Sequence, residues 1–409
     1  MTEHSIDRRG FGAERWLLPA GIEETLPAEA EAIERLRREL LDLFSSWGYL
    51  LVIPPFIEYL ESLLTGTGKD LELKTFKLTD QLTGRLMGVR ADMTPQVARI
   101  EARHLRSEQP VRLCYLGTVL YALPDGVTRS RSPIQLGAEL YGHGGVESDC
   151  EILCLMLETL RRAGVGDVHL DLGHVGIFRG LARQADLNQD EEAVLYDALQ
   201  RKAVTEIDAL LDPLKQPASG MIRDLAGLNG GEEILPLAAE RLDKASPEVR
   251  AALDSLRALA EALRARSSEV PVHFDLAELR GYRYHTGVVF AAFVPGSGQE
   301  VARGGRYDNI GRDFGRARPA TGFSADLKAL MRVRAPEDES RPQQGILAPW
   351  SAAPELQALV RRLRDAGERV IYALPGRDVD ARSLGCTRKI IERNGRFQVT
   401  EADARRPKD

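Results

Sequence analysis

The stretch RLCYLGTVLYALPDGVTRSRSPIQLGAELYG, residues 112–142, contains two apolar runs around a loop of proline, glycine, serine and arginine. Leucine, valine, isoleucine and tyrosine dominate both runs, which is typical of β-strands. No helical segment separates them, so we expect the two strands to pair antiparallel as a hairpin. The rest of the fold prediction is built outward from this hairpin.

The second run, PIQLGAELYG at 133–142, has one unusual face. Side chains alternate between the two faces of a strand, so polar and small residues collect on one side. The residues of this face are Gln135, Gly137, Glu139 and Tyr141. A glutamine and a glutamate around a glycine indicate the floor of a pocket, because a carboxylate is rarely buried without a partner. The alternative is a core carboxylate paired inside the protein.

Before the hairpin, the sequence predicts a long amphipathic helix over residues 27–48. Pro27 suits the first helical turn, and Gly48 suits the end. The apolar residues that recur at spacings of three and four are Ile33, Leu36, Leu40, Leu43, Phe44 and Trp47. A strand broken by two prolines follows at 49–59, and we expect the runs 74–80 and 85–95 to continue one antiparallel sheet with the hairpin.

After the hairpin, Ser148 and Glu151 have the spacing of a capping box, which predicts a helix that Gly164 ends. DVHLDLG at 167–173 reads as a strand. Residues from about 186 to 266 carry alanine, leucine, glutamate and arginine at helical spacing, which indicates an inserted helical unit.

The sheet is expected to resume with strands in 270–279 and 281–294 and the turn-rich GGRYDNIG at 304–311. Proline and charge predict a linker at 331–345. The remaining residues, 346–409, read as strand, helix and strand, then a charged tail with FQV as a possible last strand. That is about half of a small α/β domain.

Composition narrows the class of protein. The 409 residues are 43% apolar and 28% charged, which is typical of a soluble multi-domain chain. A net charge of −6 provides no overall basic field for nucleic acid. Four cysteines without a pairing pattern predict a reducing, cytoplasmic compartment, and we expect no metal site and no membrane span.

These elements, in this order, resemble the catalytic domain of class II aminoacyl-tRNA synthetases, and histidyl-tRNA synthetase in particular. VRADMTPQVAR at 89–99 is similar to its amino-acid loop, and 112–142 is similar to its motif 2 hairpin. The segments 278–290 and 303–311 are similar to its two histidine-specific segments. The resemblance implies an α+β fold: an antiparallel sheet flanked by helices over residues 1–330, with a truncated anticodon-binding-like domain at 346–409.

The resemblance also implies an occupant for the pocket, free histidine. The residues that match the family's histidine-binding positions are Asp92, Thr94 and Gln135 for the ammonium group, Glu139 and Tyr284 for the ring, and Arg280 for the carboxylate. Asp92 stands where the synthetase has a glutamate, and His285 where it usually has a second tyrosine. Each residue has another interpretation, because Asp92 and Thr94 also suit a turn and a strand tyrosine also suits a core.

The positions that clamp ATP in the synthetases do not match. Tyr121 stands in place of the hairpin arginine, Leu123 in place of the glutamate after it, and Ala329 in place of the motif 3 arginine. One lost donor to a developing charge typically costs about 10²–10³ in rate, so we expect no catalytic residues for adenylation and no cofactor. Arg129 and Arg131 in the hairpin loop suit either a phosphate or a solvated surface.

A kept amino-acid pocket, a lost nucleotide clamp and an incomplete tRNA-reading domain resemble the regulatory subunit family of ATP phosphoribosyltransferase. That family implies a homodimer core, a short catalytic subunit as partner, L-histidine as effector in the first step of histidine biosynthesis, and no tRNA. Two alternatives remain open: an active histidyl-tRNA synthetase, and a stand-alone amino-acid sensor of synthetase ancestry. The sequence leaves open whether histidine binds in the pocket or at the subunit interface.

Overall fold

A computed structural model gives the fold of the chain in two units, residues 1–335 and residues 336–409, which are described separately. The structure describes residues 16–66, 69–124, 130–267, 269–278, 281–282, 284–334, 345–376 and 380–402. Within these residues, no helix is both long and apolar enough to cross a membrane.

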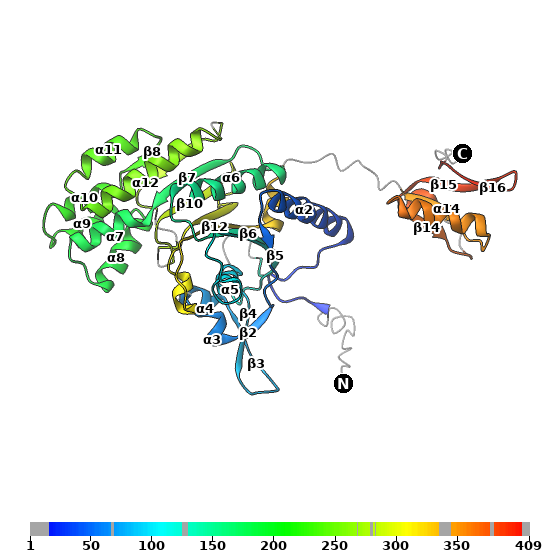
Figure 1. Ribbon diagram of the computed structural model, residues 1–409, viewed down its shortest axis with the longest axis horizontal. Coiled ribbons are helices and arrows are strands. Elements are labelled where there is room, and N and C mark those ends of the chain that lie inside the picture. Colours follow the sequence, from blue (N-terminus) through cyan, green and yellow to red (C-terminus); the bar gives the residue numbers. More distant parts are fainter. Residues whose placement is uncertain are drawn as a thin grey trace, which may run out of the picture. The chain divides into compact units, whose positions relative to one another are not determined.

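The first unit is built on a nine-stranded sheet (Figure 1). Its strands, in spatial order, are β1 (Leu50–Leu51), β5 (Val111–Thr118), β6 (Ile134–Tyr141), β12 (Ala320–Asp326), β11 (Ala302–Arg306), β10 (Val288–Phe293), β7 (His169–His174), β9 (Val272–Asp275) and β8 (Asn229–Gly230). The predicted hairpin is confirmed, because β5 and β6 pair antiparallel with Tyr115 opposite Gly137. Among the described strands of this sheet, only β1 with β5 and β7 with β9 run parallel, and the fold is α+β.

Helices cover one face of this sheet. The predicted long helix is α2 (Pro27–Ser46), and it lies beside α6 (Val146–Arg162) and α13 (Leu327–Val333). The apolar face of β6 is buried in this core, with Leu136 and Leu140 at 0 and 1% exposure. The alternation read from the sequence of β6 is therefore confirmed, and its polar face is turned to the other side of the sheet.

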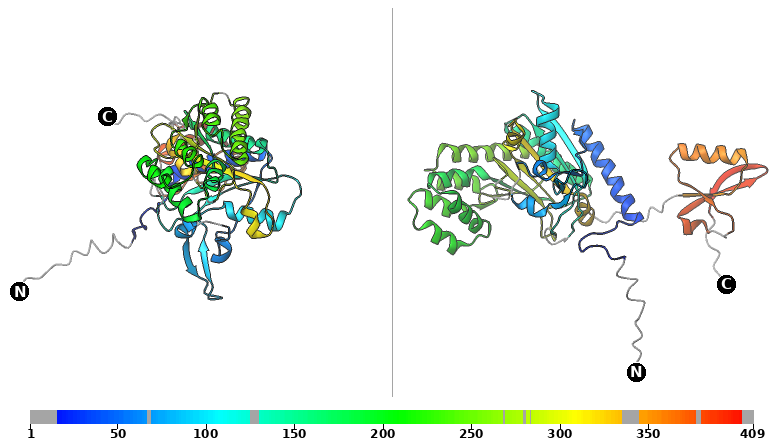
Figure 2. Two further views of the ribbon diagram at one scale, coloured as in Figure 1. Left: turned by 90° about the vertical axis from the view of Figure 1, so that its left-hand side faces the viewer. Right: turned by 90° about the horizontal axis from the view of Figure 1, so that it is seen from below.

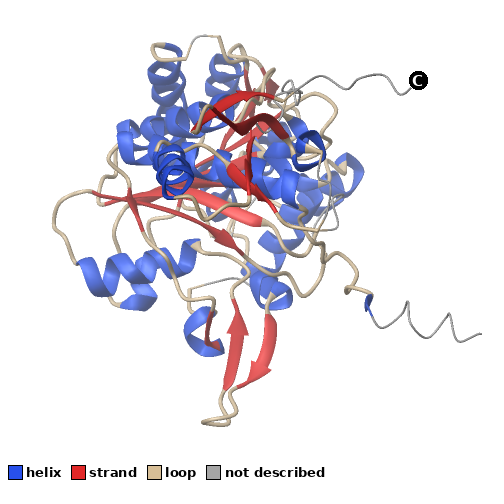
Figure 3. Cartoon of the chain, turned by 90° about the vertical axis from the view of Figure 1, so that its right-hand side faces the viewer, coloured by secondary structure: helices blue, strands red, loops and turns tan. Residues whose placement is uncertain are grey.

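On that other side lies a second, smaller sheet. Its strands are β2 (Ile57–Tyr59), β4 (Leu86–Val89) and β3 (Phe76–Thr79), and the β3–β4 hairpin projects from the unit (Figures 1 and 3). The prediction of one continuous sheet was wrong here. Pro54 and Pro55 follow β1 and lack the amide donors that a ladder needs, so the chain leaves the large sheet after two residues.

Short helices accompany this small sheet. The helices α3 (Leu60–Leu63) and α4 (Lys69–Lys74) join β2 to β3 within it, and α5 (Thr94–Ile100) with the π-helical turn η2 (Glu101–Leu105) connects β4 to β5 of the large sheet. The first residues of α5 pack against β5 and β6, where Met93 and Val97 are buried with Tyr115 and Tyr141. The loop before α5 is thereby held over the polar face of β6.

The predicted capping box at Ser148 was wrong. The helix α6 begins one turn earlier, with Gly145 as its N-cap, and the Ser148 hydroxyl donates to the Gly145 carbonyl oxygen at 2.7 Å. Glu151 instead accepts two hydrogen bonds from Arg112, at 2.6 and 2.8 Å. The predicted end of the helix is confirmed, since Gly164 follows it with a φ of +75°.

A cluster of helices lies at one end of the first unit (Figure 2). The helix α7 (Val175–Gln184) follows β7, and the segment expected to be an inserted helical unit contains α8 to α12. Their bounds are α8 (Gln189–Gln200), α9 (Val204–Leu211), α10 (Ala218–Leu225), α11 (Ile234–Arg241) and α12 (Pro247–Arg264). The two-residue strand β8 lies among them and joins the edge of the sheet beside β9.

The second unit is a four-stranded sheet in the order β14-β13-β15-β16 with its own apolar core. Its elements are β13 (Gly345–Pro349), α14 (Pro354–Asp365), β14 (Val370–Ala373), the 3₁₀ turn η4 (Ala381–Leu384), β15 (Cys386–Arg393) and β16 (Arg396–Glu401). The sequence reading missed β15, because arginine, lysine and glutamate interrupt its apolar residues. The predicted linker overlaps the end of α13, and residues 335–344 lie outside the described residues.

Candidate functional site

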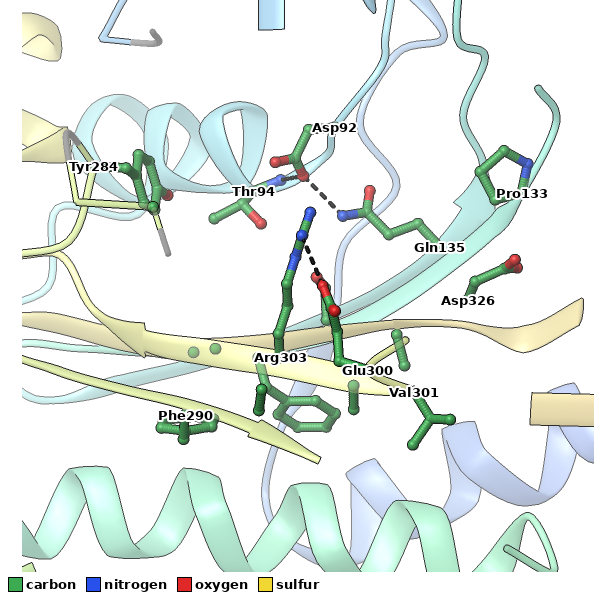
Figure 4. A pocket seen from close by; sticks show the side chains of 18 of the residues that line it. Asp92, Thr94, Pro133, Gln135, Tyr284, Phe290, Glu300, Val301, Arg303 and Asp326 are labelled. Carbon is green, nitrogen blue, oxygen red and sulfur yellow. Dashed lines mark hydrogen bonds and ion pairs between the residues drawn. The ribbon is translucent and has the colours of Figure 1, made fainter. Parts of the chain in front are cut away.

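A cavity of about 520 Å³ opens on the polar face of β6, β12 and β11 (Figure 4). Five of the six residues predicted to bind histidine line it: Asp92, Thr94, Gln135, Glu139 and Tyr284. The sixth, Arg280, lies outside the described residues. Three separate segments of the chain therefore meet at one site, as the resemblance implied: the loop before α5, strand β6 and the segment before β10.

At one end of the cavity, Asp92 and Gln135 form a cluster of hydrogen-bond acceptors. Asp92 Oδ1 accepts from Gln135 Nε2 at 2.8 Å and from the Thr94 amide at 3.0 Å, while Gln135 Oε1 accepts from the Met93 amide at 2.9 Å. These bonds also fix the turn into α5, so the structural interpretation of Asp92 and Thr94 holds as well. The cluster suits an ammonium group, which has donors only.

At the other end, the carboxylate of Glu139 is almost fully buried, at 1% exposure. Its Oε1 accepts from the Tyr115 hydroxyl at 3.0 Å, and its Oε2 accepts from the Tyr307 hydroxyl. Gly322 lies directly opposite Glu139 on β12, and a Cβ atom there would come within 1.5 Å of Oε2. The absence of a side chain at Gly322 thus makes room for the carboxylate.

Burial raises the pKa of Glu139 to about 8, although the hydrogen bonds from Tyr307 and Tyr115 oppose this shift. The ring of Tyr284 stacks on that of Tyr307 with 5.0 Å between centroids, and its buried hydroxyl has no hydrogen-bond partner among the described residues. A buried hydroxyl without a partner destabilises the fold, and such a group is found where a ligand supplies the missing hydrogen bond. This end of the pocket offers a carboxylate and aromatic rings to a ring that carries an N–H donor.

Two of the three positions predicted to replace the ATP clamp line the same cavity. Tyr121 and Ala329 line it, and the Lys74 ammonium lies 5.5 Å from the centre of the Tyr121 ring. Leu123 is exposed and does not line the cavity, and Lys328, next to Ala329, is largely buried and does not line it either.

Of the two hairpin arginines, Arg129 lies outside the described residues. The Arg131 guanidinium donates to the carbonyl oxygens of Tyr121, at 2.9 Å, and Ala20, at 3.2 Å. Arg131 thus fastens the hairpin to the N-terminal segment, and it does not line the cavity.

Sequence reasoning missed several side chains of the pocket. Tyr115 does not line the cavity itself, but it pairs with Gly137 across the hairpin and its hydroxyl donates to Glu139. The sequence predicted the hairpin but not this register. Tyr307 belongs to the GGRYD segment, in which it was not singled out. Glu300 and Asp326 also line the cavity, and no motif indicated them. Arg303 lines it from the start of the segment 303–311, in which it was not singled out.

Comparison with known proteins places the chain in a family. Residues 21–330 match the family model described as histidyl-tRNA synthetase, and residues 343–400 match that described as the ATP phosphoribosyltransferase subunit HisZ C-terminal domain. Two proteins named ATP phosphoribosyltransferase regulatory subunit are similar over nearly their whole length. That of Alkalilimnicola ehrlichii is 58% identical over 94% of this chain and 97% of the relative, and that of Ectopseudomonas mendocina is 59% identical over 94 and 98%. The chain belongs to the ATP phosphoribosyltransferase regulatory subunit family.

Solved structures agree with this regulatory subunit family and its synthetase-like fold. A protein from Bacillus halodurans, described as an ATP phosphoribosyltransferase regulatory subunit/histidyl-tRNA synthetase, is 28% identical, with a TM-score of 0.79 over 91% of this chain and 96% of that one. Histidyl-tRNA synthetase from Nostoc, at 19% identity, has a TM-score of 0.75 over 92% of this chain and 91% of that one. The second likeness concerns the fold alone, and it confirms the class II synthetase-like architecture.

Proposed function

We propose that the chain binds L-histidine in this pocket and passes that signal to a short ATP phosphoribosyltransferase catalytic subunit, without catalytic residues of its own. The observation that carries the proposal is the buried carboxylate of Glu139 beside the hydroxyl of Tyr284, which has no hydrogen-bond partner among the described residues. Imidazole is flat and has an N–H donor, so it fits between these groups, while Asp92 and Gln135 take the ammonium group.

The effect on the catalytic subunit is allosteric in this proposal. Histidine must bind two arrangements of the complex with different affinity, because equal affinity shifts no equilibrium. The partner is the short catalytic subunit that the family name implies, and tRNA is not a partner. Co-elution of the purified chain with a short ATP phosphoribosyltransferase, together with acquired sensitivity to histidine, is the expected result. A chain that binds histidine but neither binds nor regulates that enzyme would instead support a stand-alone sensor.

We also propose that the chain forms a homodimer through α2 and the strand that follows it, as class II domains commonly do. Strand β1 is an edge of the large sheet, and Leu50, Leu51 and Ile53 are 66, 46 and 81% exposed there. Apolar side chains along an open strand edge favour pairing with another chain. Catalytic chains would then attach outside this core.

An active histidyl-tRNA synthetase is the alternative that ATP–pyrophosphate exchange tests directly. Because Tyr121 and Ala329 replace two arginines that neutralise the triphosphate, we expect no histidine-dependent exchange and no charging of tRNA. Tyr121→Arg alone should not restore exchange, since Leu123 and Ala329 remain. Exchange by the unmodified chain well above a blank without enzyme would overturn this part of the proposal.

A further inference from the structure

Arg303 lies on the floor of the pocket, between the end near Gln135 and the end near Glu139. On β11 it pairs with Ser324 of β12, which in turn pairs with Gly137 of β6. On β6, Gly137 lies between Gln135 and Glu139 and shares their face. The row of residues that contains Arg303 therefore crosses the floor between the ammonium-binding end and the ring-binding end.

The small residues of this row leave space above the sheet. The side chain of Arg303 can lie over Ser324 on β12 and Gly137 on β6. The distance from β11 to β6 across these two residues is two strand spacings, about 10 Å. Figure 4 shows the Arg303 side chain extending from β11 in the direction of Thr94 and Gln135, which line the same cavity. Arg303 is thus placed to meet the same end of a ligand as Asp92.

Arg303 is a cation in a pocket whose charged lining residues are mostly acidic. The carboxylic acids that line it are Asp92, Glu139, Glu278, Glu300 and Asp326. Among the described lining residues, only Lys74 and Arg303 are Lys or Arg, and Lys74 lies near Tyr121. An amino acid carries a carboxylate two bonds from its ammonium nitrogen, so a site for it needs a cation close to the acceptor cluster. Arg303 is the described residue that meets this requirement.

In the structure, Glu300 holds the guanidinium of Arg303. Nη1 of Arg303 lies 3.0 Å from Oε1 of Glu300, and the two side chains are 58 and 24% exposed. Ion pairs with this exposure are worth little in water, typically about 0–1 kcal/mol. A carboxylate delivered by a ligand can therefore replace that of Glu300 at small cost, and arginine binds carboxylates in a bidentate manner.

We propose that Arg303 binds the carboxylate of the amino-acid effector, and that Glu300 occupies Arg303 until the effector arrives. This inference rests on the proposed histidine-binding function. It gives Arg303 the role that the resemblance implied for Arg280, which lies outside the described residues, namely to bind the group that distinguishes an amino acid from the corresponding amine. Glu300 then acts as an internal competitor that the effector's carboxylate displaces.

The test compares two ligands that share the ring and the amine, L-histidine and histamine, which has no carboxylate. Calorimetric titration of the full chain carrying Arg303→Gln should show histidine binding weakened by about ten- to a hundredfold, with histamine binding changed less than twofold. Arg303→Lys keeps a point charge, so it should weaken histidine binding less than Arg303→Gln does. Arg161→Gln is the matched control, because Arg161 forms an i,i+3 pair with Glu158 on α6 at exposures of 67 and 24%, and it should change neither affinity.

Glu300→Gln should change histidine affinity in the opposite direction. Removal of the competing carboxylate should strengthen histidine binding by about two- to fivefold and leave histamine binding unchanged. The role of Arg303 would be overturned if Arg303→Gln lowered the affinities for histidine and histamine equally, or left histidine affinity unchanged. The proposed function would stand in both cases. A wild-type chain that binds no histidine would overturn the proposed function itself.

Discussion

Glu139 is buried against two tyrosine hydroxyls, and burial disfavours its charged form more than those two hydrogen bonds favour it. With a pKa of about 8, the carboxyl is mostly protonated at pH 7 in the empty pocket. A ligand that donates an N–H to it favours the ionised form, because a charged acceptor makes the stronger bond. Binding and protonation at this residue are therefore linked.

The first prediction concerns stability and pH. Because the pKa of Glu139 is raised on folding, the folded state binds a proton more tightly than the unfolded chain, so this residue lowers the free energy of unfolding as pH rises from about 4.5 to about 8. Urea denaturation of the wild type and of Glu139→Gln at several pH values in this window should show a flatter pH dependence for the variant. Parallel curves would contradict the raised pKa.

The second prediction concerns affinity. Glu139→Gln keeps the size of the side chain but cannot take the ionised form that a bound N–H donor favours, so histidine binding to the isolated chain should weaken by about ten- to a hundredfold. Calorimetry measures the affinity, and a melting curve of the same sample checks that the fold is intact. A lower melting temperature with unchanged histidine affinity would show that Glu139 is a structural carboxylate.

At this scale, the sequence predicted the pocket well where alternation along one strand decides which way a side chain points. Gln135 and Glu139 are on the predicted face, and the apolar residues between them are in the core. Tyr307 and Arg303 could not be placed in the same way. Their positions depend on the register of β11 against β12 and β6, and on a connection of about 160 residues, which local patterns do not determine.

Between elements, Arg306 joins β11 to the beginning of α6. Its guanidinium contacts both carboxylate oxygens of Asp149, at 3.0 and 3.1 Å, and the Ser148 hydroxyl at 2.9 Å. Both members of the ion pair are buried, at 8 and 5% exposure. The chain thus uses neighbouring arginines of β11 differently: Arg306 faces the helices and Arg303 faces the pocket.

The third prediction follows from that contrast. Arg306→Met should destabilise the fold by about 3–5 kcal/mol, because Asp149 would stay buried without its cation. Arg303→Gln on the same strand serves as the control and should change stability by less than about 0.5 kcal/mol, since its side chain is largely exposed. Chemical denaturation measures both. Equal effects of the two substitutions would show that burial does not distinguish the two arginines.

Elements were predicted best where periodicity is long and worst where one local motif carried the prediction. The helix α2 repeats its buried apolar residues from Ile33 to Phe44, over about three turns, whereas the capping box at Ser148 rested on two residues whose side chains found partners elsewhere. Strand β15 was not predicted, because its charged residues obscure the alternation of apolar and polar residues, although Cys386 and Ile390 are buried. Tertiary packing overrides weak local signals of this kind.

On the scale of the whole molecule, the proposed function separates binding from chemistry. In this proposal the synthetase-like unit keeps a pocket for an amino acid, while Tyr121 and Ala329, which line the cavity, take the places of phosphate-binding arginines. The family and the synthetase-like fold could be predicted from the sequence because the matching segments are long and ordered. No pattern in one chain indicates the surface that meets a second kind of subunit, since that surface is defined by the partner.

The most direct test is a titration of L-histidine into the complex of this chain with the short catalytic subunit, with phosphoribosyl transfer as the readout. The account predicts that histidine inhibits the complex, and that Glu139→Gln raises the histidine concentration needed by about ten- to a hundredfold while the complex stays assembled. Arg161→Gln should leave the response unchanged. An unaltered histidine response in a complex that carries Glu139→Gln would contradict the account, because the effector would then act at a site other than this pocket.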